Sequence, residues 1–100
     1  MSAYVIVEIE TEDAELMARY RELSTPIVAQ HGGRFIVRGG ACETLEGDWS
    51  PQRIVVLQFD DMAQARAWWE SEAYREPKQM RQRAGRTRMI VSTAWHSVAC

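Results

Sequence analysis

Two side chains that could bind a ligand or transfer a proton lie close together in the stretch HGGRFIVRGG, residues 31–40. Arg38 follows an apolar run and alternates with Ile36, so its stem is expected to be partly buried and its guanidinium to need an anion. Glu43 or Glu46 in the next segment could supply that anion as a structural salt bridge. A substrate carboxylate is the equal alternative, because it can accept two hydrogen bonds from one guanidinium.

His31 is expected in the last turn of a helix, where a protonated imidazole is stabilised by the negative helix end. The functional alternative is a general base or a hydrogen-bond donor at the mouth of a cleft. The flanking glycine pairs do not predict a phosphate-binding loop, which needs glycines between a strand and a following helix. Here one pair follows a helix and the other joins two strands, so a cap and a turn explain them. Arg53 resembles Arg38 but is a weaker candidate.

Aromatic side chains cluster in the second half of the chain, at Trp68, Trp69 and Tyr74. Adjacent residues of a helix are about 100° apart, so the two tryptophans cannot face the same direction. One of them is expected in the core, and the other lines a cleft or a dimer contact. Tyr74 could present its hydroxyl to a pocket. Ser71 is expected to cap a helix rather than to bind a ligand.

The basic run RQRAGRTR, residues 81–88, does not predict nucleic-acid binding. It extends from a helix end to an edge strand, where cations complement the helix dipole and discourage edge pairing. The net charge is -2 and the sequence pI about 5.7, so neither nucleic acid nor an anionic membrane is favoured as a partner.

No metal or cofactor site is predicted. Cys42 and Cys100 are far apart and form no CxxC motif, so both are expected to be free thiols. His31 and His96 have no second ligand at metal-binding spacing, and His96 is expected at the surface. The start of the chain has no basic leader and no apolar run of membrane length, which predicts a cytoplasmic protein.

Apolar periodicity predicts four strands and two helical regions in the order β-α-β-β-α-β. The strands are expected at residues 4–10, 33–39, 53–60 and 87–95. This order is that of an α+β ferredoxin-like sandwich, here one domain of residues 1–100 with a core at about 4–95 and a C-terminal extension at 96–100. Right-handed crossovers place the first and third strands in the middle of an antiparallel sheet.

Capping and breaking residues predict where the helices begin and end. Thr11 or Asp13 is expected to cap the first helix, and Pro26 to kink it or end it early. Asp60 or Asp61 is expected to cap the second helical region, which should break near Ser71. Beyond that break, Pro77 is expected in a first helical turn and Gly85 at the C-terminal cap.

The two central strands are apolar on both faces, which one layer of helices does not explain. The first strand reads YVIV before its first charge and the third reads IVVL. A sheet with water on one side should instead alternate apolar and polar residues. A second copy of the chain is therefore expected to pack against the helix-free face, as a homodimer.

HGGRFIVRGG, LEGDW, PQRIVVLQF and AWWESEAY, with Arg81 soon after, resemble the bacterial family called domain of unknown function 1330. The likeness covers residues 4 to about 95, although Trp69 stands where tyrosine is common. It implies the fold of the dimeric α+β barrel superfamily and a position for Arg81 near the cleft. It implies no particular reaction, because that superfamily includes cofactor-free monooxygenases, isomerases and haem-degrading enzymes.

Together these features predict a small homodimer with a cleft for a small, partly apolar metabolite that can be anionic. The expected ligand-binding residues are Arg38, Trp69, Tyr74, His31 and Arg81, of which His31 and Tyr74 are also the catalytic candidates. One alternative is a cofactor-free enzyme of the monooxygenase or isomerase type. The other is a dimer without chemistry, in which these side chains only stabilise the fold.

Overall fold

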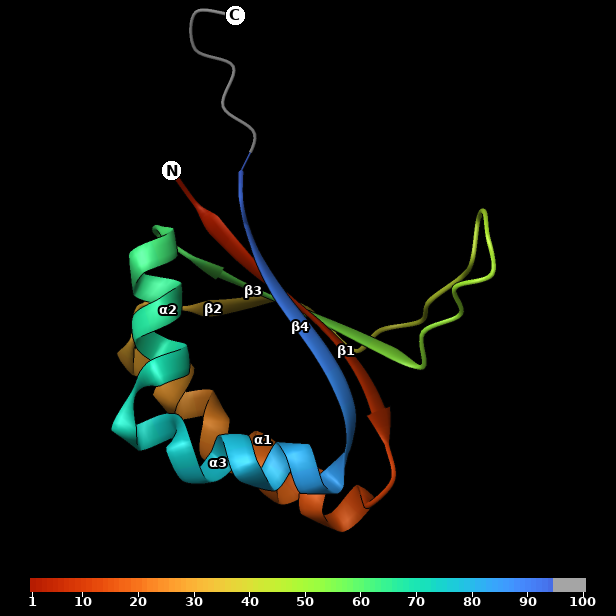
Figure 1. Ribbon diagram of the computed structural model, residues 1–100, viewed down its shortest axis with the longest axis horizontal. Coiled ribbons are helices and arrows are strands. Elements are labelled where there is room, and N and C mark those ends of the chain that lie inside the picture. Colours follow the sequence, from red (N-terminus) through yellow and green to blue (C-terminus); the bar gives the residue numbers. More distant parts are fainter. Residues whose placement is uncertain (95–100) are drawn as a thin grey trace, which may run out of the picture.

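The computed structural model describes residues 1–94 and shows an antiparallel sheet with three helices on one side (Figure 1). His96, Cys100 and the predicted extension lie outside the described residues. The elements are β1 (Ala3–Thr11), α1 (Ala14–Gln30), β2 (Arg34–Arg38), β3 (Arg53–Phe59), α2 (Met62–Glu70), α3 (Glu72–Ala84) and β4 (Gly85–Thr93).

The strand order is β2-β3-β1-β4, which confirms the predicted ferredoxin-like arrangement. Both central pairings are antiparallel, and Val7 of β1 lies opposite Val55 of β3 and Met89 of β4. Alternate residues of β1, including Val5 and Val7, are buried under the helices. The core therefore lies between the sheet and the helical layer, and any cleft between these two layers must open at its edges.

Helix α1 begins at Asp13, whose carboxylate accepts a hydrogen bond from the Leu16 amide at 3.0 Å. The sequence predicts either a kink or an early end of the helix at Pro26. The early end is wrong, because α1 continues to Gln30. The turn after Pro26 includes Val28, which is buried in the core. Burial of this turn offsets the one backbone hydrogen bond that proline cannot donate.

Ser71 separates α2 from α3, as predicted. Its hydroxyl donates to the Trp68 carbonyl at 2.8 Å and accepts from the Tyr74 amide at 3.2 Å. Since this cap starts α3 at Glu72, Pro77 lies beyond the first helical turn, and its predicted place in that turn is wrong. The cap also directs Trp68 and Tyr74 to the same side of the helical layer, where their rings meet.

The helix-free side of the sheet, called here the open face, carries an apolar centre. Ile6 of β1 lies between Val56 of β3 and Ile90 of β4, and Ile90 is 62% exposed. Beside this centre, Glu8 pairs with Arg88 at 2.7 Å. Within residues 1–94, no helix is long and apolar enough to cross a membrane.

The loop of residues 39–52 joins β2 to β3 and extends away from the rest of the chain (Figure 1). One hydrogen bond, 2.8 Å from the Trp49 indole nitrogen to a Glu8 carboxylate oxygen, ties it to the open face. This bond and Arg88 lower the pKa of Glu8. Leu45 in this loop is 92% exposed.

Candidate functional site

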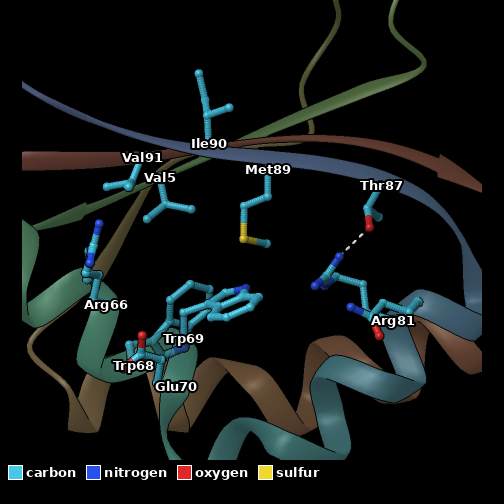
Figure 2. A pocket seen from close by; sticks show the side chains of 12 residues that line it. Val5, Arg66, Trp68, Trp69, Glu70, Arg81, Thr87, Met89, Ile90 and Val91 are labelled. Carbon is cyan, nitrogen blue, oxygen red and sulfur yellow. Dashed lines mark hydrogen bonds between the residues drawn. The ribbon is translucent and has the colours of Figure 1, made fainter.

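A cavity of about 420 Å³ lies between α2, α3 and β4, and we call it the Arg81 cavity (Figure 2). Its walls are mostly apolar, with Met89 and Val91 on the β4 side and the tryptophans on the α2 side. The lining residues are Val5, Ala65, Arg66, Trp68, Trp69, Glu70, Arg81, Gln82, Thr87, Met89, Ile90 and Val91. This volume is within the range of small-molecule sites, which combine apolar walls with a few polar groups.

Arg81 is the principal polar group of this cavity. It comes from the last turn of α3 and is only 3% exposed, and its Nη1 donates a hydrogen bond to the Thr87 hydroxyl (Figure 2). Its Nε is buried without a hydrogen-bond partner. No carboxylate lies within salt-bridge distance of Arg81 among residues 1–94. A buried guanidinium of this kind is stabilised when an anion binds beside it.

The two tryptophans differ in burial, and Trp68 is both a core residue and part of the cavity wall. Trp68 is 1% exposed, with its ring centroid 4.4 Å from that of Tyr74 and 5.5 Å from that of Phe59. Trp69 is 42% exposed and lines the Arg81 cavity. The Lys78 ammonium lies 3.6 Å from the centroid of the Trp69 ring, which holds the indole in place.

Tyr74 lies behind the cavity wall rather than in the cavity lining. It is fully buried, and its hydroxyl is 2.6 Å from that of Tyr20 on α1. Burial raises the pKa of Tyr74 above its ordinary value, and the neighbouring Tyr20 raises it further, while the positive charge of Arg81 acts in the opposite direction. Tyr74 therefore keeps its proton at neutral pH and is suited to hydrogen bonding rather than to accepting a proton.

The raised pKa of Tyr74 makes the protein less stable at alkaline pH. Above about pH 10 the unfolded chain loses this proton while the folded protein keeps it, so the unfolding free energy falls by up to ~1.4 kcal/mol per pH unit. Urea unfolding at a series of alkaline pH values measures this slope. Tyr74→Phe should reduce the slope, and equal slopes in both proteins would show that Tyr74 ionises normally in the fold.

Arg38 lies on the helix side of the sheet, and not on the side of Ile36 as the alternation predicts. The pairing of β2 with β3 shifts between Phe35 and Val37, so one residue is skipped. Arg38 consequently returns to the side of Phe35, and its guanidinium carbon lies 3.9 Å from the centroid of that ring. In the described chain it forms no ion pair with Glu43 or Glu46.

A second recess, called here the arginine recess, contains Arg38. It opens where α1 meets the ends of β2 and β3, and it is lined by Ala18, Arg21, Glu22, Thr25, Arg38 and Arg53. Between the two sites runs a crevice of about 30 Å³, with Arg38 and Arg53 at one side and Arg81 and Trp68 at the other. The Arg81 cavity and the arginine recess share no lining residue, so they are two sites.

His31 is the C-terminal cap of α1, just beyond the last turn in which the sequence predicts it. Its Nδ1 donates to the Ile27 carbonyl at 2.8 Å, a bond that fixes the ring at the helix end. It is not among the residues that line the Arg81 cavity, the crevice or the arginine recess. Of the predicted ligand-binding residues, the Arg81 cavity thus brings together Trp69 and Arg81 only.

Several polar residues of these sites, among them Thr87, Tyr20 and Arg21, were not predicted from the sequence. Thr87 holds Arg81, Tyr20 holds Tyr74, and Arg21 lines the arginine recess. Tyr20 is one of the buried residues of α1, and an apolar pattern that predicts burial does not show which partner a hydroxyl will meet. The pairing of Thr87 with Arg81 depends on the turn from α3 into β4.

The sequence matches the family model described as "Domain of unknown function (DUF1330)" over residues 2–95. The chain belongs to this family. The match covers nearly the whole chain and confirms the resemblance seen in its motifs. A search of curated proteins found no match.

Several solved structures resemble the fold of this DUF1330 protein. A protein of unknown function from Rhodopseudomonas palustris has a TM-score of 0.77 at 19% identity, over 96% of this chain and 84% of that chain. A dimeric ferredoxin-like protein of unknown function from a Jannaschia species gives 0.66 at 18%, over 94% and 100%. SnoaB, a cofactor-independent oxygenase from Streptomyces nogalater, gives 0.65 at 12%, over 98% and 97%. At these identities the likeness shows the fold alone.

Proposed function

We propose that this DUF1330 protein is a homodimer in which each subunit binds a small, partly apolar, anionic metabolite in the Arg81 cavity. The observation that carries the proposal is the buried Arg81 guanidinium, which has an unpartnered Nε and no carboxylate mate within residues 1–94. Taking a charge out of water costs several kcal/mol unless it is paired. An anionic ligand supplies the missing partner.

The shape and lining of the cavity support an aromatic or branched carboxylate. Trp69 and Met89 offer apolar and polarisable contacts to a ring, and Arg81 offers N–H donors to a carboxylate. Arg66 and Glu70 lie at the α2 side of the same cavity. A cavity of about 420 Å³ suits a ligand the size of a single substituted ring rather than a nucleotide.

The apolar centre of the open face supports the dimer. Ile6, Val56 and Ile90 lie together there, and a depression beside them includes Trp49 and Ile54. The Jannaschia protein, whose fold resembles this one, is described as dimeric. In a two-fold dimer the same apolar surface of each chain packs against its copy, so a second chain is the partner that fits this face.

Isothermal titration with phenylacetate and its uncharged amide, phenylacetamide, tests the binding proposal. The two probes have the same ring, so their difference reports the charge alone. We expect phenylacetate to bind at least 10-fold more tightly, since a charge-assisted hydrogen bond contributes about 1.5–3 kcal/mol. Arg81→Gln should remove this preference.

Arg83→Gln is the matched control, because Arg83 lies in the same helical turn but is exposed. It removes the same charge from the protein and should leave the preference for phenylacetate unchanged. Equal binding of the acid and the amide to the unmodified protein would contradict the proposal. So would an equal loss of binding in both variants.

A cofactor-free oxygenase is the second candidate, and the likeness to SnoaB favours it. Its chemistry would need a group that removes a proton from the substrate. Tyr74 keeps its proton at neutral pH because its pKa is raised, so it cannot accept one, and His31 is hydrogen-bonded at the helix end. Oxygen consumption with an added phenolic substrate would support this candidate. Its absence would favour a protein that binds the metabolite without a reaction.

A further inference from the structure

We propose that the arginine recess is a second binding site, and that it takes a dianionic oxyanion group such as that of a phosphate monoester. Arg21, Arg38 and Arg53 surround the recess on three different elements, α1, β2 and β3. The site is distinct from the Arg81 cavity and does not depend on the function proposed for it.

The guanidinium of Arg38 is held in position before any ligand binds. It lies over the ring of Phe35, 3.9 Å from the centroid, and its Nη2 donates to the Thr25 hydroxyl at 2.5 Å. The same hydroxyl donates to the Arg21 carbonyl at 2.6 Å. Such a side chain loses little conformational freedom on binding an anion.

The guanidinium of Arg53 is also fixed, by close packing against the backbone of Gly39. A Cβ atom at position 39 would lie 2.5 Å from the Cζ and Nε of Arg53. Gly39 has a φ of +75°, a conformation that favours glycine. The Nε of Arg53 is buried and has no hydrogen-bond partner. One donor of this side chain is thus left without an acceptor.

The charges of the recess are not balanced by the protein. No salt bridge involves Arg21, Arg38 or Arg53 in the described part of the chain, and Glu22 is the one acidic residue in the lining. Burial lowers the pKa of Arg53, and the positive charges of Arg21 and Arg38 lower it further. The three cations therefore repel one another in the free protein.

The net charge of the lining suggests the valence of the ligand. Three guanidinium groups and the carboxylate of Glu22 leave two positive charges, which a dianion neutralises. A single carboxylate would leave one of these two positive charges without a counterion. The planar fork of arginine matches the oxygen atoms of a phosphoryl group, which can accept hydrogen bonds from several guanidinium groups at once.

Calorimetric titration with inorganic phosphate at about pH 8 tests the site, with acetate at equal ionic strength as the monoanionic comparison. We expect phosphate to bind and acetate to bind at least 10-fold more weakly. Arg38→Gln and Arg53→Gln should each weaken phosphate binding at least 10-fold, because each removes a charge-assisted hydrogen bond. Arg21→Gln serves in the same way should one of these variants fail to fold.

Arg19→Gln is the matched control, since Arg19 lies on α1 but is exposed and outside the recess. It should change phosphate binding less than about 2-fold. Absence of phosphate binding, or equal weakening by Arg19→Gln and Arg38→Gln, would overturn the proposal, because the second result indicates a diffuse effect of net charge.

Arg81→Gln separates this site from the metabolite cavity. It should leave phosphate binding unchanged, and Arg53→Gln should leave the preference for phenylacetate unchanged. Failure of phosphate binding alone would remove the second site and keep the first. Failure of phenylacetate binding alone would do the reverse.

Discussion

Replacing Ile90 with glutamate is expected to convert the proposed dimer into a monomer and raise its dissociation constant at least 100-fold. Ile90 is 62% exposed in the single chain and lies at the centre of the open face, opposite Ile6. In a dimer through this face, a carboxylate at position 90 would be buried without a partner, at a cost of several kcal/mol. Light scattering over a series of protein concentrations measures the change in mass.

Thr93→Glu is the control for this substitution. Thr93 is on the same strand and exposed, but it lies opposite Ala3 and so faces the helix side of the sheet. The same charge at position 93 should leave the mass of the assembly unchanged. An Ile90→Glu protein that remains dimeric would place the interface on another surface.

Replacing Arg81 with methionine is expected to leave the free protein as stable or up to ~3 kcal/mol more stable, while abolishing its stabilisation by phenylacetate. Methionine keeps much of the apolar stem of Arg81 and removes a buried charge that lacks a carboxylate partner within residues 1–94. The lost hydrogen bond to Thr87 is the smaller effect. Urea unfolding with and without phenylacetate measures both results.

The sign of this change distinguishes a binding arginine from a structural one. Removal of an arginine that completes a buried ion pair destabilises the fold by about 3–5 kcal/mol, because its acidic partner stays buried and unpaired. Arg83→Met, at an exposed position of the same helix turn, should change stability by less than about 0.5 kcal/mol. A large loss of stability in Arg81→Met without any loss of phenylacetate binding would assign Arg81 to the fold alone.

The fold could be predicted from the sequence because its signals are local and consistent. Strands with apolar runs, capping residues such as Asp13 and Ser71, and glycines after helices define the element order. The order and the right-handed crossover then decide which strands are central. Pro26 shows the limit of such signals, since the burial of Val28 in the next turn keeps the helix intact.

The candidate site was harder to predict because it depends on contacts between distant residues. Strand alternation placed Arg38 beside Ile36, and a one-residue shift in the β2–β3 pairing moved it to the other side. No residue type in β2 indicates this shift in the pairing. Helix geometry, by contrast, predicts that Trp68 and Trp69 face different directions. Only the structure shows that Trp68 is the buried one.

Arg81 is a candidate binding residue because the fold buries it without an acidic partner among residues 1–94. In the sequence it is one of several cations in a basic run, and its neighbours Arg83 and Arg86 are indeed exposed. The turn from α3 into β4 buries Arg81 beside Thr87, with no acid close enough to pair within residues 1–94. Sequence alone can show the charge of a residue but not its lack of a partner.

Nitrogen-15 spectra of the arginine side chains test the central claim most directly, because they report on the Nε–H group of Arg81 itself. On addition of phenylacetate, we predict that the Arg81 resonance shifts in proportion to occupancy, while those of Arg83 and Arg53 stay in place. The same amount of phenylacetamide should leave all three unchanged. An Arg81 resonance that does not move while phenylacetate binds would show that the ligand site lies elsewhere in the molecule.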